Sequence, residues 1–207
     1  MSERFPGYDV LAKRHTPSWN EKTRQVIDER LALPREPRYL SQEEWLVLEA
    51  ICERIVPQPG ARAPVPLSAM VDAKLFENRG DGYRDYGLPP LREAWRRGLR
   101  AIDAEARRRH NVGFAALDAP EQDALLRAAQ QGTLPHGGWD GMPAKIFFAK
   151  RLLPDIVTLY YAHPIAWNEI GFGGPASPRG LCPDGFRSPR PVGSNRSQAR
   201  SRHRSRA

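Results

Sequence analysis

Helix-start signatures recur along this chain and constrain its fold more than any other feature. In each signature, a cap residue with a side-chain oxygen is followed three residues later by a glutamate. The two side chains can then bond each other's backbone N–H groups at the first turn of a helix. The three pairs are Ser18 with Glu21, Ser41 with Glu44, and Asp118 with Glu121. Apolar residues follow at helical steps of three and four, and after Ser41 they are Trp45, Leu48, Cys52 and Ile55.

These signatures predict helices and leave little room for a sheet. The expected helical ranges are 18–33, 41–56, 67–75, 89–110, 118–132 and 143–161, with a kink or split at Pro154 in the last. Alternation of period two never exceeds four residues, so a substantial sheet is not expected. The predicted fold is all-α: a compact irregular bundle of about five to six helices with long Gly/Pro loops.

The positive charge is concentrated at the C-terminal end. The formal net charge of the 207 residues is +8, and residues 179–207 hold eight arginines against the single acid Asp184, which is +7. We expect an N-terminal extension with one helix over 1–38, a helical domain over 39–180, and a disordered Arg/Ser-rich tail over 181–207. The nearly neutral body argues against specific nucleic-acid binding, since such domains carry their basic footprint on a folded face.

The sequence lacks the common catalytic motifs. There is no glycine-rich nucleotide loop, nucleophile elbow, zinc-protease helix or CxxCH haem motif. The five histidines are scattered, and none has a second ligand residue at metal-binding spacing. We therefore expect no catalytic, cofactor-binding or metal-binding residue in this chain. The alternative is an independent small helical enzyme or ligand-binding protein with a pocket near His136 and His163.

The stretch from Leu159 to Gly180 is unusual because it sets four aromatic residues among glycines and prolines. Aromatic side chains on a stiff frame suit a protein–protein anchor, since they offer large contact area at low entropic cost. The alternative is a strap that packs back on its own bundle. The predicted partner-binding residues are Tyr160, Tyr161, His163, Trp167, Phe172 and Gly173.

An ordered set of segments resembles the gluconate 2-dehydrogenase subunit 3 (gamma subunit) family over roughly residues 39–180. Each segment is short, and their order carries the resemblance. The segments are Leu40–Trp45 leading into Ile51–Pro59, Val71–Asp72, Gly98–Asp103, Phe114–Leu117 before Glu121–Asp123, Phe147–Phe148, and Tyr160–Pro164 leading to Gly171–Pro175.

The resemblance implies a small, mostly helical accessory subunit without catalytic groups of its own. Its partner would be a large FAD-dependent dehydrogenase of the glucose–methanol–choline type, which oxidises sugars, sugar acids or other alcohols. In many such systems a cytochrome c subunit accepts the electrons. The small subunit would support folding, stability or export of the large one.

The N-terminus departs from the family pattern. Many members carry a twin-arginine signal, whereas residues 1–11 here show neither paired arginines nor an apolar stretch. We therefore expect a cytoplasmic location, or a periplasmic one if the chain is exported together with its partner. The longest apolar run, Ile156–Ala162, is too short to cross a bilayer, so we expect no membrane insertion.

Overall fold

The computed structural model describes residues 5, 7–58, 64–80, 82, 85–135 and 138–175. Within these ranges the chain forms helices joined by turns and loops, with no strand, so the all-α prediction is confirmed. The predicted disordered tail, residues 181–207, lies outside the described residues, as does His136.

Eight α-helices make up most of the described chain. Their bounds are α1 Glu21–Leu31, α2 Gln42–Ile55, α3 Leu67–Phe76, α4 Leu91–His110, α5 Ala119–Gln131, α6 Ala144–Phe147, α7 Leu153–Tyr161 and α8 Pro164–Ile170. Two 3-10 helices, η1 Val10–His15 and η2 Phe114–Ala116, and one π-helical segment, η4 Phe148–Leu152, complete the order.

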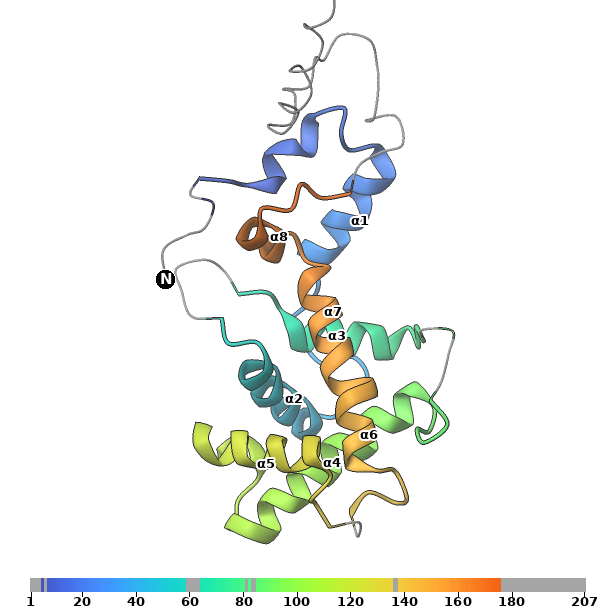
Figure 1. The fold of residues 1–207 in the computed structure, drawn as a ribbon. Helices are drawn as coiled ribbons and strands as arrows, with labels where there is room; N and C mark the ends of the chain where they lie inside the picture. The colour runs from blue at the N-terminus through green and yellow to red at the C-terminus, as the bar shows by residue number, and fades with distance from the viewer. Residues whose placement is uncertain are drawn as a thin grey trace, which may run out of the picture.

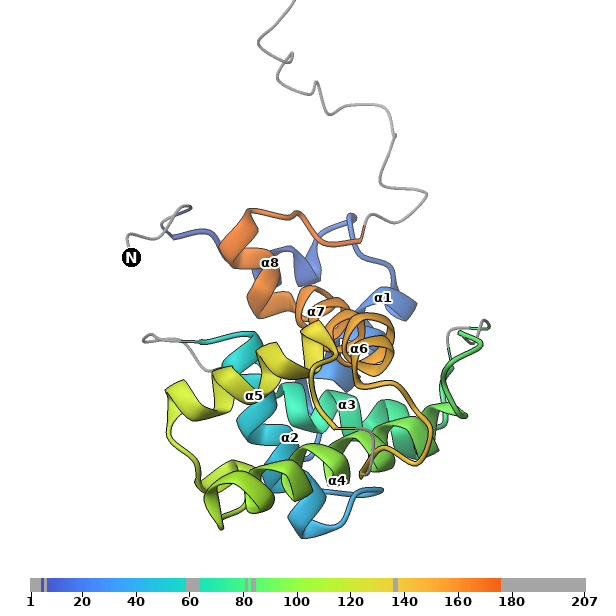
Figure 2. The ribbon, with the colours of Figure 1, turned by 60° about the horizontal axis from the view of Figure 1, so that its bottom comes forward.

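The helices form a large lobe and a smaller one (Figure 1). Helices α2 to α6 build the large lobe, and α7 rises from it toward α1, η1 and α8. In Figure 2, α2 and α3 lie between α4 and α7, and α8 lies beyond α7. None of the described helices has the length and apolar content that a bilayer crossing requires.

Two of the three predicted capping boxes are present. The Ser41 hydroxyl accepts from the Glu44 N–H at 3.2 Å, and the Glu44 carboxylate accepts from the Ser41 N–H at 3.0 Å. Asp118 and Glu121 cap α5 in the same reciprocal way. The prediction for α1 was wrong in its cap: the side chain of Asn20, not Ser18, accepts from Thr23. The Trp19 N–H donates to the Thr16 carbonyl and closes a turn before the helix. The helix therefore begins only at Glu21, and the Trp19 side chain is buried.

Helix α4 carries the predicted apolar face into the core of the large lobe. Its buried residues include Leu91, Trp95, Leu99, Ile102 and Ala106. Gly98 is buried on the same face, because the ring of Phe147 from α6 lies directly over it. That ring also meets Trp95 edge-on, with the two centroids 5.8 Å apart.

The helix predicted over 143–161 is divided near Pro154, as expected: α6 ends at Phe147 and the π-helical segment η4 separates it from α7, although the three follow one another without a loop (Figure 1). Proline cannot donate the bond that an α-helix needs at its position. The helix widens just before it, so that the Leu153 N–H reaches Phe148 C=O, five residues back. This π turn lies directly before the proline that lacks an N–H donor, and it joins α6 to α7.

A buried carboxylate attaches the N-terminal segment to the large lobe. Asp72 of α3 accepts from three consecutive backbone N–H groups, those of Arg38 at 2.7 Å, Tyr39 at 3.1 Å and Leu40 at 2.9 Å. These bonds fix the chain just before α2 begins, at the boundary expected between extension and domain.

Candidate functional site

Helix α8 lies within the predicted partner-binding segment and was itself not predicted. His163 is its cap residue, Pro164 occupies the first helical position, and Gly171 ends it with φ +66°. Proline at the start and glycine at the end are typical helix boundaries. The positive φ favours glycine at this turn, and a side chain there would meet the end of the Phe5 ring at 2.8 Å.

The N-terminal extension covers the inner face of α8. Trp167 is 4% exposed and packs in a cluster with Val10, Trp19 and Ile27. Its indole N–H donates to the Tyr161 carbonyl at 2.6 Å.

Hydrogen bonds from the same extension hold the two sides of this lobe together. The Val10 N–H donates to the Asn168 side chain at 2.7 Å, and the Tyr8 hydroxyl donates to the Phe172 carbonyl at 3.1 Å. Because these bonds join residues about 160 positions apart in sequence, the small lobe needs both parts of the chain.

Three of the predicted partner-binding residues are buried within this chain, and their contact with a partner stays a prediction. Tyr160, His163 and Trp167 are all less than 9% exposed; Tyr160 packs in the main core, and Trp167 packs against the N-terminal extension. Gly173 is half-buried, and its carbonyl accepts from the Lys13 ammonium at 3.4 Å. The segment therefore behaves largely as the strap that was the alternative interpretation.

Four apolar side chains around α8 do reach solvent, and we call them the α8 patch. They are Phe5 at 39%, Ile170 at 46%, Phe172 at 48% and Tyr161 at 49% exposed. Tyr161 and Phe172 were predicted, whereas Phe5 and Ile170 were missed. The signal for Ile170 was available, since the boundaries His163-Pro164 and Gly171 define the helix that presents it.

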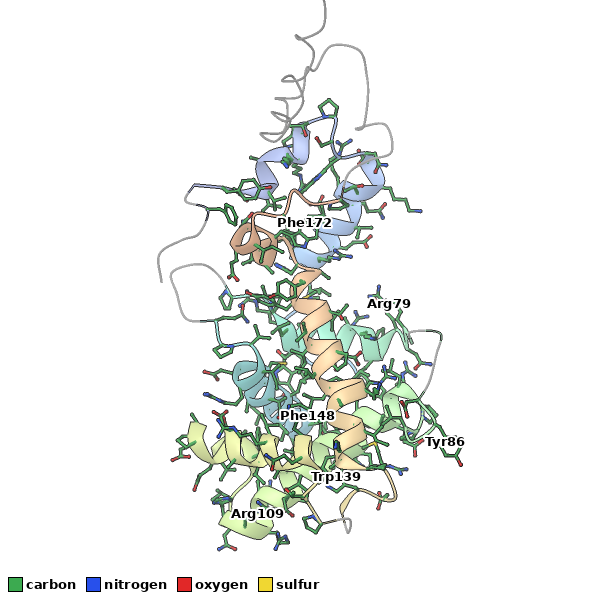
Figure 3. The ribbon with its side chains drawn as sticks, in the orientation of Figure 1. Arg79, Tyr86, Arg109, Trp139, Phe148 and Phe172 are labelled. Carbon is green, nitrogen blue, oxygen red and sulfur yellow. The ribbon has the colours of Figure 1, made fainter. Side chains whose placement is uncertain are left out.

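Buried aromatic residues support the exposed ones. Phe172 meets the ring of Trp167 edge-on at 5.6 Å, and Tyr161 meets Tyr160 in the same way at 5.2 Å. Figure 3 labels Phe172 in the small lobe, far from Trp139 and Phe148 of the large lobe. The patch thus consists of side chains held on a packed base rather than on a free loop.

His163 is a neutral structural residue in this setting. Its Nδ1 accepts from the Ile165 N–H at 3.3 Å, which caps α8. Burial, together with the positive charges of Arg30 and Arg35, lowers the pKa of His163 to about 4. An unprotonated ring is required for this acceptor role.

Tyr160 is held in the same region by a carboxylate. Its hydroxyl donates to Glu169 of α8, and burial with this neighbouring negative charge raises the pKa of Tyr160. The bond ties α7 to α8 across the turn at His163. Neither His163 nor Tyr160 is placed as a proton donor or acceptor for an outside molecule.

Buried ionisable groups elsewhere also serve the fold. Asp155 accepts from the Trp95 indole and from Lys74, both at 2.9 Å, and Glu44 pairs with Arg100 at 2.9 Å. Burial raises the pKa of the Cys52 thiol, which disfavours the reactive thiolate. Within the described ranges, no group of three or more His, Cys, Asp or Glu residues is placed to hold a metal ion.

Comparison with known proteins identifies one family. The model of the family described as gluconate 2-dehydrogenase subunit 3 matches residues 42–174, from the start of α2 to the turn after α8. No curated protein and no solved structure matches the chain. The family match covers well over half of the 207 residues and includes most of the α8 patch. The chain therefore belongs to the gluconate 2-dehydrogenase subunit 3 family, a family of small subunits of dehydrogenase complexes.

Proposed function

We propose that this chain is the non-catalytic accessory subunit of an FAD-dependent dehydrogenase of the glucose–methanol–choline type. The large subunit would carry the FAD and oxidise a sugar, a sugar acid or another alcohol. The small subunit would support the folding, stability or export of that large subunit. Family membership supports the general role, and the α8 patch is the observation that carries the assignment of a partner contact.

The α8 patch has the composition and support of an anchor. Aromatic residues dominate the energetics of protein interfaces, and a rigid base limits the entropy lost on binding. Tyr161 and Phe172 are half exposed and rest on the buried rings of Tyr160 and Trp167. Such side chains can bury their remaining surface in a partner without rearrangement of the helix below.

The buried ionisable groups are hydrogen-bonded within the chain, which supports the non-catalytic part of the proposal. Catalytic acids and bases must be free to exchange protons with a substrate. Here Asp72 binds backbone N–H groups, Asp155 binds Trp95 and Lys74, and His163 caps a helix. The redox chemistry would belong to the flavin of the partner.

Co-purification tests the proposal directly. The tagged chain is expressed in its own host, recovered under mild conditions, and the visible spectrum of the eluate is recorded. We expect a stoichiometric large partner with flavin absorption at roughly 370 and 450 nm, since the cofactor supplies the colour. A colourless 23.4 kDa protein that elutes alone would refute the assignment.

Substitutions in the patch then test the contact. Phe172→Ala and Tyr161→Ala should each weaken the complex by about 2 kcal/mol, or about thirtyfold in Kd, if they are anchors. Tyr86→Ala is the matched control, because Tyr86 is a fully exposed aromatic residue on the large lobe (Figure 3). Equal losses in all three variants, or no loss in any, would contradict a contact at α8.

The compartment and the electron acceptor are parts of the same proposal. The chain would act in the cytoplasm, or in the periplasm if it is exported with its partner, and a cytochrome c subunit could join the complex. Cell fractionation determines the compartment. The co-purification then detects a cytochrome, because a bound c-type haem adds a sharp band at roughly 410 nm to the flavin spectrum.

A further inference from the structure

A second surface, at the end of the molecule opposite α8, is basic rather than apolar. A groove of about 510 Å³ lies along the N-terminal half of α4. Figures 1 and 2 place α4 and α8 at opposite ends of the protein, and Figure 3 labels Arg109 near the C-terminal end of α4. The groove is lined by Arg92, Arg96, Arg97 and Arg100, together with Tyr39, Asn78, Pro90, Glu93, Gly138 and Asp140.

Contacts within the chain orient the arginines of the groove. Arg92 and Arg96 lie over the ring of Tyr39, with guanidinium carbons 4.9 and 4.4 Å from its centroid. Arg92 donates to the carbonyls of Leu75 at 2.7 Å and Phe76 at 2.6 Å. These contacts restrict the motion of the Arg92 and Arg96 side chains before any ligand binds. Ligand binding would therefore cost less side-chain conformational entropy.

The positive charge of this surface is only partly neutralised. The lining holds four arginines against Glu93 and Asp140, which is +2. Arg38, which stacks on Phe76 beside the groove, and Glu44, buried behind it, bring the tally to five arginines against three carboxylates, again +2. Among the described residues, Arg92 pairs with no carboxylate; both of its hydrogen bonds go to backbone oxygens. The other lining arginines have carboxylate partners: Arg97 pairs with Glu93, and Arg96 and Arg100 share Glu44. The charge left for an anionic partner is therefore that of Arg92 and the part of Arg96 and Arg100 that one shared carboxylate does not neutralise.

The backbone positions of these arginines, one helical turn apart, are compatible with an extended polypeptide as that partner, although the Arg96 and Arg100 side chains converge on Glu44. Arg92, Arg96 and Arg100 are four residues apart, which is about 6 Å of helix rise per step. Alternate side chains of an extended chain are about 6.6 Å apart and point to the same side. The geometry points to a docking groove for an extended acidic segment of the large subunit, with carboxylates at alternating positions facing Arg92, Arg96 and Arg100.

This inference rests on the proposed function for the identity of the partner, but its chemistry can be tested separately. The probe is a short, fluorescently labelled peptide in which glutamate alternates with serine. Its binding to the full chain is followed by anisotropy at low ionic strength. A peptide of the same composition with contiguous glutamates, a glutamine version and inorganic phosphate serve as comparisons. We expect the alternating peptide to bind most tightly and to weaken as salt is added.

Arg100→Gln tests the groove at a side chain that is 69% exposed; it removes one of the two arginines that pair with the buried Glu44, and Arg96 keeps the other pair. Arg107→Gln is the matched control on the same helix: its side chain is 63% exposed and pairs with Asp103, but it lies outside the groove. We expect Arg100→Gln to weaken the alternating peptide about threefold to fivefold, and Arg107→Gln to leave it unchanged. Thermal unfolding of both variants shows whether the fold is intact.

Several results would overturn the inference. Equal binding of the alternating and contiguous peptides would show that the spacing of the glutamates does not matter. Equal losses of affinity in Arg100→Gln and Arg107→Gln would show that the peptide responds only to the overall positive charge. Phosphate binding without peptide binding would make the groove a small-anion site. If the flavin-bearing complex forms with unchanged affinity after Arg100→Gln, this inference fails and the proposed function stands. If no complex forms but the alternating peptide binds selectively, the proposed function fails and the groove remains.

Discussion

Gly98 is the position where one added methyl group should do the most damage. A Cβ atom there would lie 2.2 Å from Cζ of Phe147, 2.4 Å from Cε1 and 2.7 Å from Cε2. Ordinary carbon contacts are about 3.5–4.0 Å, so the ring would have to move by more than about 1 Å. Phe147 is fully buried between Trp95 and Trp139, which limits such movement.

Two opposing free-energy changes set the expected size of the effect of Gly98→Ala. Overpacking a close-packed core costs about 3 kcal/mol at the upper end of its usual range. Alanine is about 1 kcal/mol better than glycine inside a helix. The net expectation is a loss of about 2 kcal/mol in the free energy of unfolding, or about 4–8 °C in Tm for a domain of this size.

The effect of Gly98→Ala on the free energy of unfolding should change sign when Phe147 is replaced. In a Phe147→Ala background the ring is gone, so the added methyl of Gly98→Ala no longer clashes. The helix-propensity gain of about 1 kcal/mol should then stabilise the protein relative to Phe147→Ala alone. Ala104→Gly, on the exposed side of the same helix, measures that propensity term independently.

Urea unfolding followed by circular dichroism at the helical band measures all of these variants. The double-mutant cycle should give a coupling of about 3 kcal/mol between positions 98 and 147. If Gly98→Ala is neutral or stabilising with Phe147 present, the ring does not lie on this glycine and the packing described for α4 and α6 is refuted.

Three further predictions concern the links between the lobes. Asp72→Ala should cost about 3–5 kcal/mol in the free energy of unfolding, because it leaves three backbone donors without their carboxylate; urea denaturation measures this, and a loss below about 1 kcal/mol would contradict it. Because the pKa of His163 is lowered to about 4, its contribution to stability is complete above about pH 6.5 and is lost as the pH falls toward 4. That loss is on the order of 2 kcal/mol after solvent screening, and His163→Asn, which keeps a cap oxygen, should flatten the slope. Deletion of residues 1–31 should expose Trp167 and loosen α8 while α2 to α6 stay folded, which hydrogen exchange would resolve; unchanged protection of α8 would argue against the packing of the N-terminal extension on Trp167.

Local sequence patterns predicted the parts of the fold that local chemistry determines. The cap pairs Ser41–Glu44 and Asp118–Glu121 work at short range, and both appear in the structure. Gly132 ends α5 in the left-handed conformation, as glycine at such a position favours. Each of these features depends on only a few neighbouring residues.

Other features depend on contacts that no local pattern contains. Whether Trp167 is exposed depends on Val10, Trp19 and Ile27, more than a hundred residues away along the chain. An aromatic residue between a proline and a glycine is equally compatible with an anchor and with a strap. For the same reason, the role of Asp72 could not be predicted from its place in a short apolar helix, since the backbone N–H groups that donate to it precede α2.

The folded unit of this protein extends beyond the region that the family model matches. The family match begins at residue 42, yet residues 5–31 supply Phe5 to the α8 patch and cover the buried side of Trp167. Without them, the same residues of the family domain would present a large apolar surface with a different shape. An N-terminal extension that completes a contact surface can change which partner that surface fits without any change in the domain behind it. In this protein, specificity for the large subunit at α8 should therefore depend on the extension, whereas the arginine groove, built on α4 within the matched region, should act independently of it.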